Sequence, residues 1–298
     1  MRHNPRKRFG QNFLVDQHMI AQIIAEIRPQ KGDRLIEIGP GLGALTRPLL
    51  QATGHLDVVE IDRDIVARLN KEFTPDQLTI HATDALKFDF SALGSKLRIA
   101  GNLPYNISTP LLFHLSQFSA HILDMHFMLQ KEVVDRMVGA PATSDYGRLS
   151  VMLQYRFDME YVFSVPAESF RPVPKVESAI VRMIPRDAST RIVKDEAVFS
   201  QIVTAAFSQR RKTLRNTLQQ HLTSDDVDRD FKFGGAERKG GMFQVHGHAA
   251  YDFVHGAGHD GQFNERENDD ACKKRSAHSQ KDHQCKTECT IYDGRDAP

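Results

Sequence analysis

The sequence predicts an α/β protein with a doubly wound, mostly parallel β-sheet. Short β-type runs alternate with helix-type segments from about residue 34 onward, which is the rhythm of right-handed strand–helix–strand crossovers. A glycine-rich turn at residues 39–43 follows the first of these runs and opens a helical segment. Two later apolar runs are joined by a segment too short for a helical crossover, so we expect an antiparallel strand at the sheet edge. The 298 residues suffice for one large domain or two of ordinary size.

The elements are expected in the following order. Asp16 can cap a first helix in which four isoleucines share one face, namely Ile20, Ile23, Ile24 and Ile27. Strands are expected at residues 35–38, 56–61, 78–81, 97–100 and 125–129. Helices are expected over residues 44–51 and 64–73, from about residue 109, and over residues 131–138. The antiparallel pair comprises residues 161–165 and 179–184, and helical spacing returns over residues 195–222.

Charge is unevenly distributed along the chain. The formal net charge is +1, but residues 1–222 carry 28 basic and 23 acidic side chains, whereas residues 223–298 carry 11 and 15. A mildly basic body fits a polyanionic partner, and it equally fits a solvated surface. The same two interpretations hold for two basic segments. They are the N-terminal Arg2, Arg6, Lys7 and Arg8, interleaved with Phe9 and Phe13, and the helical cluster Arg210, Arg211, Lys212 and Arg215.

Cysteine usage and hydropathy indicate a cytoplasmic protein without a membrane partner. All three cysteines lie in the last 30 residues, so nothing suggests a disulfide framework for the body. No apolar run of about 18 residues is present, and no signal-type apolar segment follows the basic N-terminus. The cysteines and histidines near the C-terminus match no standard zinc-finger spacing, so we expect no metal site.

The turn at residues 39–43 indicates a cofactor site but leaves the cofactor open. Glycines at 39, 41 and 43 allow a tight turn and a close approach of the backbone to a ligand. The pattern also satisfies the dinucleotide fingerprint if Ala44 replaces its last glycine. Glu60 ends the second expected strand at the spacing of a carboxylate that binds ribose hydroxyls, in nicotinamide or S-adenosyl-methionine enzymes.

Two further features favour a methyl donor and an adenine-like substrate. Asp84, just beyond the third expected strand, can accept a hydrogen bond from the adenine amino group of the cofactor. Asn102 and the Pro104 carbonyl can accept from the two N–H bonds of a substrate amine, while the Tyr105 ring stacks on its base. A hydride-transfer enzyme has no evident use for this combination. The plain alternative is a type I or II turn with proline at its second position.

Four motifs together resemble the family of small-subunit ribosomal RNA adenine dimethyltransferases. They are Gln-Asn-Phe-Leu at residues 11–14, the glycine turn, Asn-Leu-Pro-Tyr at residues 102–105, and Phe-x-Pro-x-Pro-Lys-Val-x-Ser at residues 170–178. The resemblance runs from about Arg6 to Leu222. It implies a Rossmann-like methyltransferase domain over residues 1–186 and the start of a helical C-terminal domain over residues 187–222. The remaining residues, 223–298, do not resemble the family.

The resemblance also implies an activity and the residues that perform it. The activity is transfer of methyl groups from S-adenosyl-methionine to N6 of two adjacent adenines near the 3′ end of 16S rRNA, in the small ribosomal subunit, by a monomer. Asn102 and the Pro104 carbonyl would hold the target amine, and Tyr105 with Phe170 would hold the base. The S-adenosyl-methionine contacts would be Asn12, Leu14, Gly39, Gly41, Glu60, Asp84 and Asn102. We expect no dedicated general base.

Three alternatives compete with this interpretation. One is another adenine-N6 methyltransferase, acting on large-subunit rRNA or DNA, because the corner at residues 102–105 suits any exocyclic amine. The others are a nicotinamide oxidoreductase and a catalytically impaired RNA-binding or ribosome-assembly factor. The last gains weight because residues 223–298 contain no leucine. We therefore expect an incomplete helical domain and a disordered tail.

Overall fold

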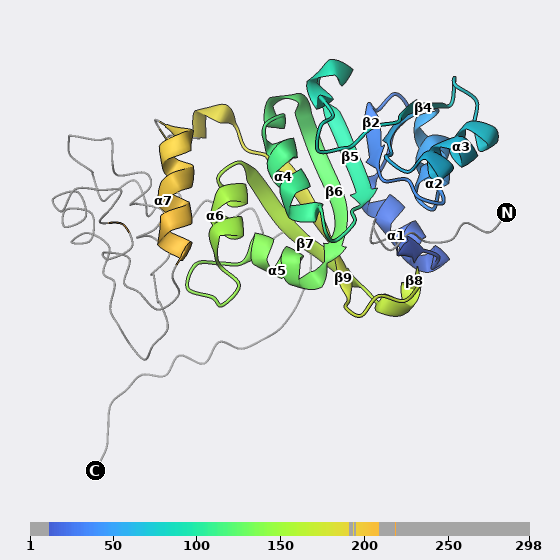
Figure 1. Ribbon diagram of the computed structural model, residues 1–298. Coiled ribbons are helices and arrows are strands. Elements are labelled where there is room, and N and C mark those ends of the chain that lie inside the picture. The colour runs from blue at the N-terminus through green and yellow to red at the C-terminus, as the bar shows by residue number, and fades with distance from the viewer. Residues whose placement is uncertain (1–11, 191–192, 194, 209–217, 219–298) are drawn as a thin grey trace, which may run out of the picture. The chain divides into compact units, whose positions relative to one another are not determined.

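A computed structural model describes residues 12–190, 193, 195–208 and 218, and centres on a seven-stranded mixed sheet (Figure 1). The strand order is β4-β3-β2-β5-β6-β9-β7. The first five strands of this order are parallel, and β9 runs antiparallel to both of its neighbours. The bounds are β2 Leu35–Ile38, β3 Leu56–Val59, β4 Leu78–His81, β5 Leu97–Asn102, β6 Ile122–Gln130, β7 Phe157–Val165 and β9 Ser178–Pro185. The expected doubly wound sheet with an antiparallel pair at one edge is confirmed.

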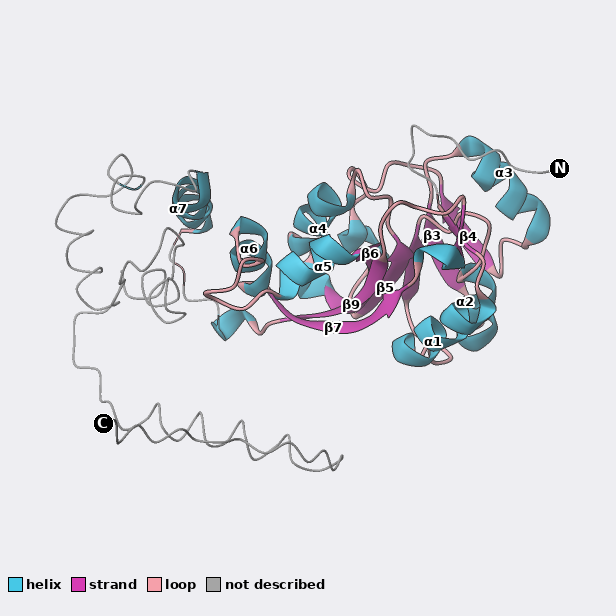
Figure 2. Ribbon diagram, turned by 90° about the horizontal axis from the view of Figure 1, so that it is seen from below, coloured by secondary structure: helices cyan, strands magenta, loops and turns pink. Residues whose placement is uncertain are grey.

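Helices cover both faces of the sheet (Figure 2). On one face, α1 (Gln17–Ile27), α2 (Thr46–Thr53) and α3 (Arg63–Glu72) bury their apolar side chains against the strands. On the other face, α4 (Ser108–Ser116), α5 (Lys131–Val138) and α6 (Arg148–Gln154) build the second half of the core. Each strand of a parallel sheet is thereby shielded on two sides, as its apolar sequence requires.

The first helix shows how local sequence sets an element. The Asp16 side chain accepts hydrogen bonds from the backbone N–H groups of His18 and Met19, so it caps α1 as expected. Of the four isoleucines on the predicted face, Ile20, Ile23 and Ile27 are buried. The helix ends where Arg28 adopts a left-handed conformation, at φ 49°.

The structure departs from the sequence-based expectation in several places. The strand expected at 56–61 ends at Val59, and those expected at 125–129 and 161–165 begin earlier, at Ile122 and Phe157. The predicted strand 97–100 continues to Asn102, because Gly101 and Asn102 pair with Phe127 and Met128 of β6. Helix α6 was not predicted. Nor was a two-stranded antiparallel sheet in which β1 (Phe13–Leu14) pairs with β8 (Phe170–Arg171), since strands of two residues have no recognisable period.

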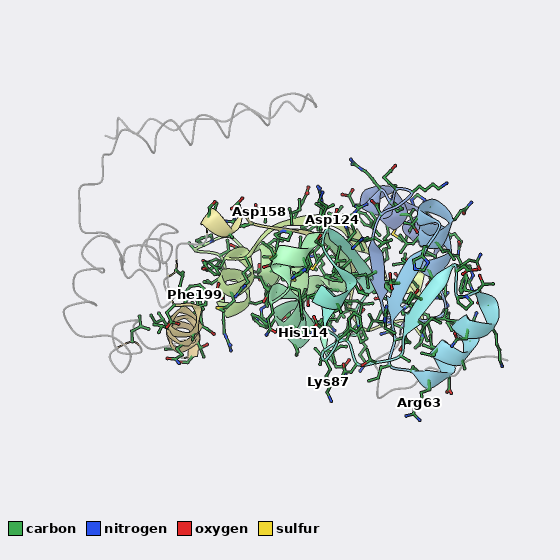
Figure 3. The ribbon with its side chains drawn as sticks, turned by 90° about the horizontal axis from the view of Figure 1, so that it is seen from above. Arg63, Lys87, His114, Asp124, Asp158 and Phe199 are labelled. Atoms are coloured by element: carbon green, nitrogen blue, oxygen red, sulfur yellow. The ribbon has the colours of Figure 1, made fainter. Side chains whose placement is uncertain are left out.

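The predicted helix at 195–222 is confirmed in its first part as α7 (Glu196–Ser208). Figure 3 labels Phe199 on this helix, and its ring centroid lies 4.9 Å from that of Tyr155. The predictions for the basic segments, the tail and its cysteines fall on residues outside the described part. Within the described part, no helix combines the length and apolarity needed to cross a lipid bilayer.

Candidate active site

A cavity of about 280 Å³ lies at the carboxyl ends of the parallel strands. Its walls come from the segments that follow β2, β3 and β4, from the end of β5, and from the N-terminal residues 12–14. This is the edge at which open α/β sheets bind their ligands. All the predicted site residues except Phe170 line this one cavity, namely Asn12, Leu14, Gly39, Gly41, Glu60, Asp84, Asn102, Pro104 and Tyr105.

Two glycines let the strand ends converge here. A Cβ atom added to Gly101 would lie only 2.5 Å from the carbonyl oxygen of Ile38, so the paired strands β2 and β5 approach too closely for any side chain. Gly41 has a φ of +54°, and a Cβ atom there would lie 3.2 Å from the ring of Phe13. Because these positions are glycine, the turn at residues 39–43, Asn102 and the N-terminal segment can all lie beside the same cavity.

Glu60 forms one acidic wall of the cavity. It is 7% exposed, and its Oε1 accepts a hydrogen bond of 2.7 Å from the backbone N–H of Asp62. Burial raises the pKa of the carboxyl, and hydrogen bonds from the backbone N–H groups of Asp62, Ile61 and Gly41 act in the opposite direction. The backbone thus holds this carboxylate in place at the end of β3, where it can accept from ligand hydroxyls.

Glu37 is a second carboxyl in the same wall, and sequence reasoning gave it no role. It is 2% exposed, and its Oε2 accepts a 2.6 Å hydrogen bond from the Thr46 hydroxyl. Burial, with a smaller contribution from the charge of Glu60, raises its pKa to about 7, and the hydrogen bond from Thr46 acts in the opposite direction. Two neighbouring buried carboxyls suit a ligand that combines positive charge with hydroxyl groups. These two carboxyls therefore fit S-adenosyl-methionine, which has a positively charged sulfonium and ribose hydroxyls.

Asp84 supplies a third carboxyl at the end of β4. Its Oδ1 accepts a 3.0 Å hydrogen bond from the backbone N–H of Leu86, which fixes the side chain in a local turn. Among the described residues, Oδ2 has no hydrogen-bond partner. An acceptor held in this way suits the amino group of an adenine ring.

The side chain of Asn102 is oriented by a residue 90 positions away. Its Nδ2 donates a 3.1 Å hydrogen bond to the carbonyl oxygen of Asn12. Because the donor end of the amide is engaged there, Oδ1 is the end that remains to accept from a substrate. The amide is thus arranged as an acceptor for an amine.

Pro104 and Tyr105 complete the corner. The Pro104 carbonyl accepts a 3.2 Å hydrogen bond from the backbone N–H of Ile107, so this turn begins at the proline. The alternative of a turn with proline at its second position does not describe it. A carbonyl oxygen has two lone pairs, and the second is left for a substrate N–H. The Tyr105 hydroxyl lies 2.9 Å from the Ser178 hydroxyl oxygen, and burial raises the pKa of the phenol.

Phe170 lies elsewhere than expected. Its side chain is 1% exposed and packs in the core cluster that contains Leu14, its partner in the β1–β8 register. It does not line the cavity. The ring therefore belongs to the core that holds β1, and not to the cavity in which a substrate base was expected to contact it.

Comparison with known proteins agrees with these features. The sequence model of the family described as "Ribosomal RNA adenine dimethylase" matches residues 2–233. A protein of Nitrosospira multiformis named "Ribosomal RNA small subunit methyltransferase A" is 64% identical over 226 residues, which are 76% of this chain and 87% of that protein. A protein of the same name from Nitrosomonas europaea is 65% identical over 229 residues, 77% of this chain and 89% of the relative.

Solved structures agree on the fold. A dimethyladenosine transferase from Plasmodium falciparum superposes with a TM-score of 0.63 at 27% identity, covering 74% of this chain and 80% of that one. The 23S rRNA methyltransferase ErmE gives a TM-score of 0.61 at 24% identity over 82% of this chain and 98% of its own, which shows the shared fold alone. With its cavity, its acidic donor wall and its match over most of its length, the chain belongs to the ribosomal RNA adenine dimethylase family.

Proposed function

We propose that this chain transfers methyl groups from S-adenosyl-methionine to N6 of two adjacent adenines near the 3′ end of 16S rRNA, in the small ribosomal subunit. The observation that carries the proposal is the Asn102 amide, which is oriented as an acceptor in a cavity that also contains Glu60 and Asp84. The names of the two relatives above support the small subunit as the source of the RNA. We infer that the chain acts as a cytoplasmic monomer.

The donor side of the cavity holds the cofactor through carboxylates and backbone. Glu60 accepts from the ribose hydroxyls, and Asp84 accepts from the adenine amino group. The backbone at Gly39 and Gly41, together with Asn12 and Leu14, closes around the remainder of the cofactor. When bound, S-adenosyl-methionine supplies a methyl group that is already activated on a sulfonium.

The target side makes the adenine amine reactive. Its lone pair is delocalised into the ring, so the free amine is a poor nucleophile. Asn102 Oδ1 and the Pro104 carbonyl accept from the two N–H bonds, which favours a pyramidal nitrogen with an exposed lone pair. The main contribution of the protein is then alignment, which can supply up to ~7–11 kcal/mol in favourable cases. Transfer of the methyl group leaves the nitrogen cationic and strongly acidic, so it loses one N–H proton to solvent, and we assign no general base.

The base must leave its stack to reach this corner. Stacking on the Tyr105 ring returns roughly 1–3 kcal/mol of the cost of unstacking. Two exposed cations, Arg63 and Lys87, follow cavity-lining residues at the ends of β3 and β4 and point outward in Figure 3. They suit the phosphates of the flanking strand.

A comparison of substrates tests the proposal. The full chain is incubated with labelled S-adenosyl-methionine and, in separate reactions, with undermethylated small subunits, large subunits and DNA. We expect label in the small-subunit RNA. Label confined to large subunits or DNA would establish one of the other adenine methyltransferases instead. Donor binding without any transfer would identify an impaired RNA-binding factor.

A further inference from the structure

A buried serine outside the cavity contacts the ring that faces the target base. Ser178 is the first residue of β9 and is 0% exposed. Its hydroxyl oxygen lies 2.9 Å from the hydroxyl oxygen of Tyr105, across 73 residues of sequence. Tyr105 lines the cavity and Ser178 does not, so the serine acts on the site only through the tyrosine.

Ser178 is held more rigidly than Tyr105. It pairs with Gln130 of β6 on one side and with Val165 of β7 on the other, so its backbone is fixed by two strands. The preceding residue is also fixed, because the Lys131 N–H donates a 3.0 Å hydrogen bond to the Glu177 carbonyl. Tyr105 lies in the turn that follows β5, where backbone pairing does not constrain the ring. The hydrogen bond therefore lets β9 restrain the Tyr105 side chain.

The ring of Tyr105 needs such a restraint to serve as a stacking surface. A side chain on a turn samples several rotamers, and each rotamer directs the ring to a different place. A hydrogen bond at the tip of the ring, made to a buried and immobile partner, selects one of them. The hydrogen bond also gives each hydroxyl a partner, which matters because a buried polar group without a partner is unfavourable.

Resting on the proposed function, we propose that Ser178 is a positioning residue for the target adenine. Its hydroxyl holds the Tyr105 ring in the orientation that accepts the base, and it contributes nothing to donor binding. Ser178→Ala and Tyr105→Phe remove the same hydrogen bond from opposite sides. Each should therefore impair use of the RNA to the same extent.

A double-mutant cycle on the full chain tests this proposal. We expect each single variant to raise the KM for small subunits about fivefold, as the loss of one hydrogen bond implies, with donor affinity unchanged in calorimetry. The double variant should match either single one, because the bond can be lost only once. Ser178→Thr, which keeps the hydroxyl, should restore the KM. The matched control is Ser116→Ala, another buried serine, whose hydroxyl donates to the Phe113 carbonyl away from the cavity.

A second readout separates this proposal from the proposed function. With ring-labelled tyrosine, the Tyr105 signal in NMR should shift or broaden in Ser178→Ala but not in Ser116→Ala, whatever substrate the enzyme uses. An unchanged Tyr105 signal would overturn the positioning role. So would additive effects in the cycle, or a wild-type KM in both single variants. A wild-type chain that fails to methylate small subunits would overturn the proposed function, leaving the NMR result to decide the role of Ser178.

Discussion

The two halves of the cavity are built in different ways. On the donor side, each functional carboxylate accepts from a backbone N–H two residues further along the chain, Glu60 from Asp62 and Asp84 from Leu86, and Glu60 also accepts from Gly41. On the target side, the orienting contacts join residues that lie 90 and 73 positions apart in the sequence. Asn102 is held by Asn12, and Tyr105 is held by Ser178.

The donor side therefore depends on local folding, whereas the target side depends on contacts between distant parts of the domain. The donor-side carboxylates are held mainly by backbone N–H groups close to them in the sequence. We therefore expect donor binding to tolerate substitutions in distant parts of the chain. The target corner exists only when β1, β8 and β9 are in place. Substitutions that loosen β9 should therefore impair use of the RNA before they impair donor binding. Loosening β1 or β8 should impair both, because Asn12 and Leu14 are assigned to the cofactor.

The largest expected effect comes from Asn102→Ala. Loss of the oriented acceptor should reduce methylation about a thousandfold, at the upper end of what removal of one preorganised polar group costs. Donor binding should weaken but remain measurable, because Glu60 and Asp84 are intact. The measurements are single-turnover transfer and calorimetry, with the exposed Asn70→Ala as control. Near-normal turnover in Asn102→Ala would refute the assigned role.

Glu37→Gln should change how stability depends on pH. The pKa of Glu37 is raised to about 7 in the folded chain from 4.5, so the group favours the folded state below pH 4.5 and loses that contribution as pH rises through 7. The amide keeps an acceptor for Thr46 and carries no charge. The stability gain of the variant over wild type should therefore grow between pH 5 and pH 8, up to about 3 kcal/mol. Urea unfolding measures this gain, and a gain independent of pH would contradict the account.

A matched pair of aspartates tests the donor wall. Asp84→Ala should raise the Kd for S-adenosyl-methionine about tenfold, the effect of one charge-assisted hydrogen bond, with kcat preserved at saturating donor. Asp89 is the control, because its Oδ1 accepts from the N–H of Ser91 in the same kind of turn but does not line the cavity. Equal losses in both variants would mean that Asp84 only holds its turn.

Phe170→Leu should have the smallest effect. Replacing a buried ring by a smaller side chain should lower the free energy of unfolding by about 1 kcal/mol. It should also raise the KM for RNA modestly, because Leu14 and the N-terminal segment lose support. Denaturant unfolding and steady-state kinetics measure the two quantities. A large rise in KM at unchanged stability would instead restore Phe170 as a residue that contacts the base.

The donor half could be predicted from the sequence because its signals are local. The glycine turn follows an apolar run, Glu60 lies near the end of a predicted strand, and Asp84 lies just beyond another. The parallel edge then brings them to one place. The residues of the corner at 102–105 could be predicted in the same way, from their position after an apolar run. The strand itself is longer than predicted, because β5 continues to Asn102.

The target half could be predicted only in part, because its arrangement depends on distant contacts. Two-residue strands such as β1 and β8 carry no periodic signal, so nothing revealed that Phe170 lies buried against Leu14. Ser178 belonged to a recognised motif without a role. The one available signal was a polar residue at the start of an apolar run. The raised pKa of Glu37 follows from a burial that composition does not show.

The identity of the product nucleoside tests the central claim most directly. After reaction of the full chain with undermethylated small subunits, the RNA is digested and its nucleosides are separated by mass spectrometry. The arrangement of Asn102, Pro104 and Tyr105 predicts methylation at N6, and membership of the family predicts that it proceeds to N6,N6-dimethyladenosine. Neither product should accumulate when Asn102→Ala replaces the wild type. Methylation of a ring nitrogen, a ribose hydroxyl or another base would contradict the claim that this corner serves an adenine amine.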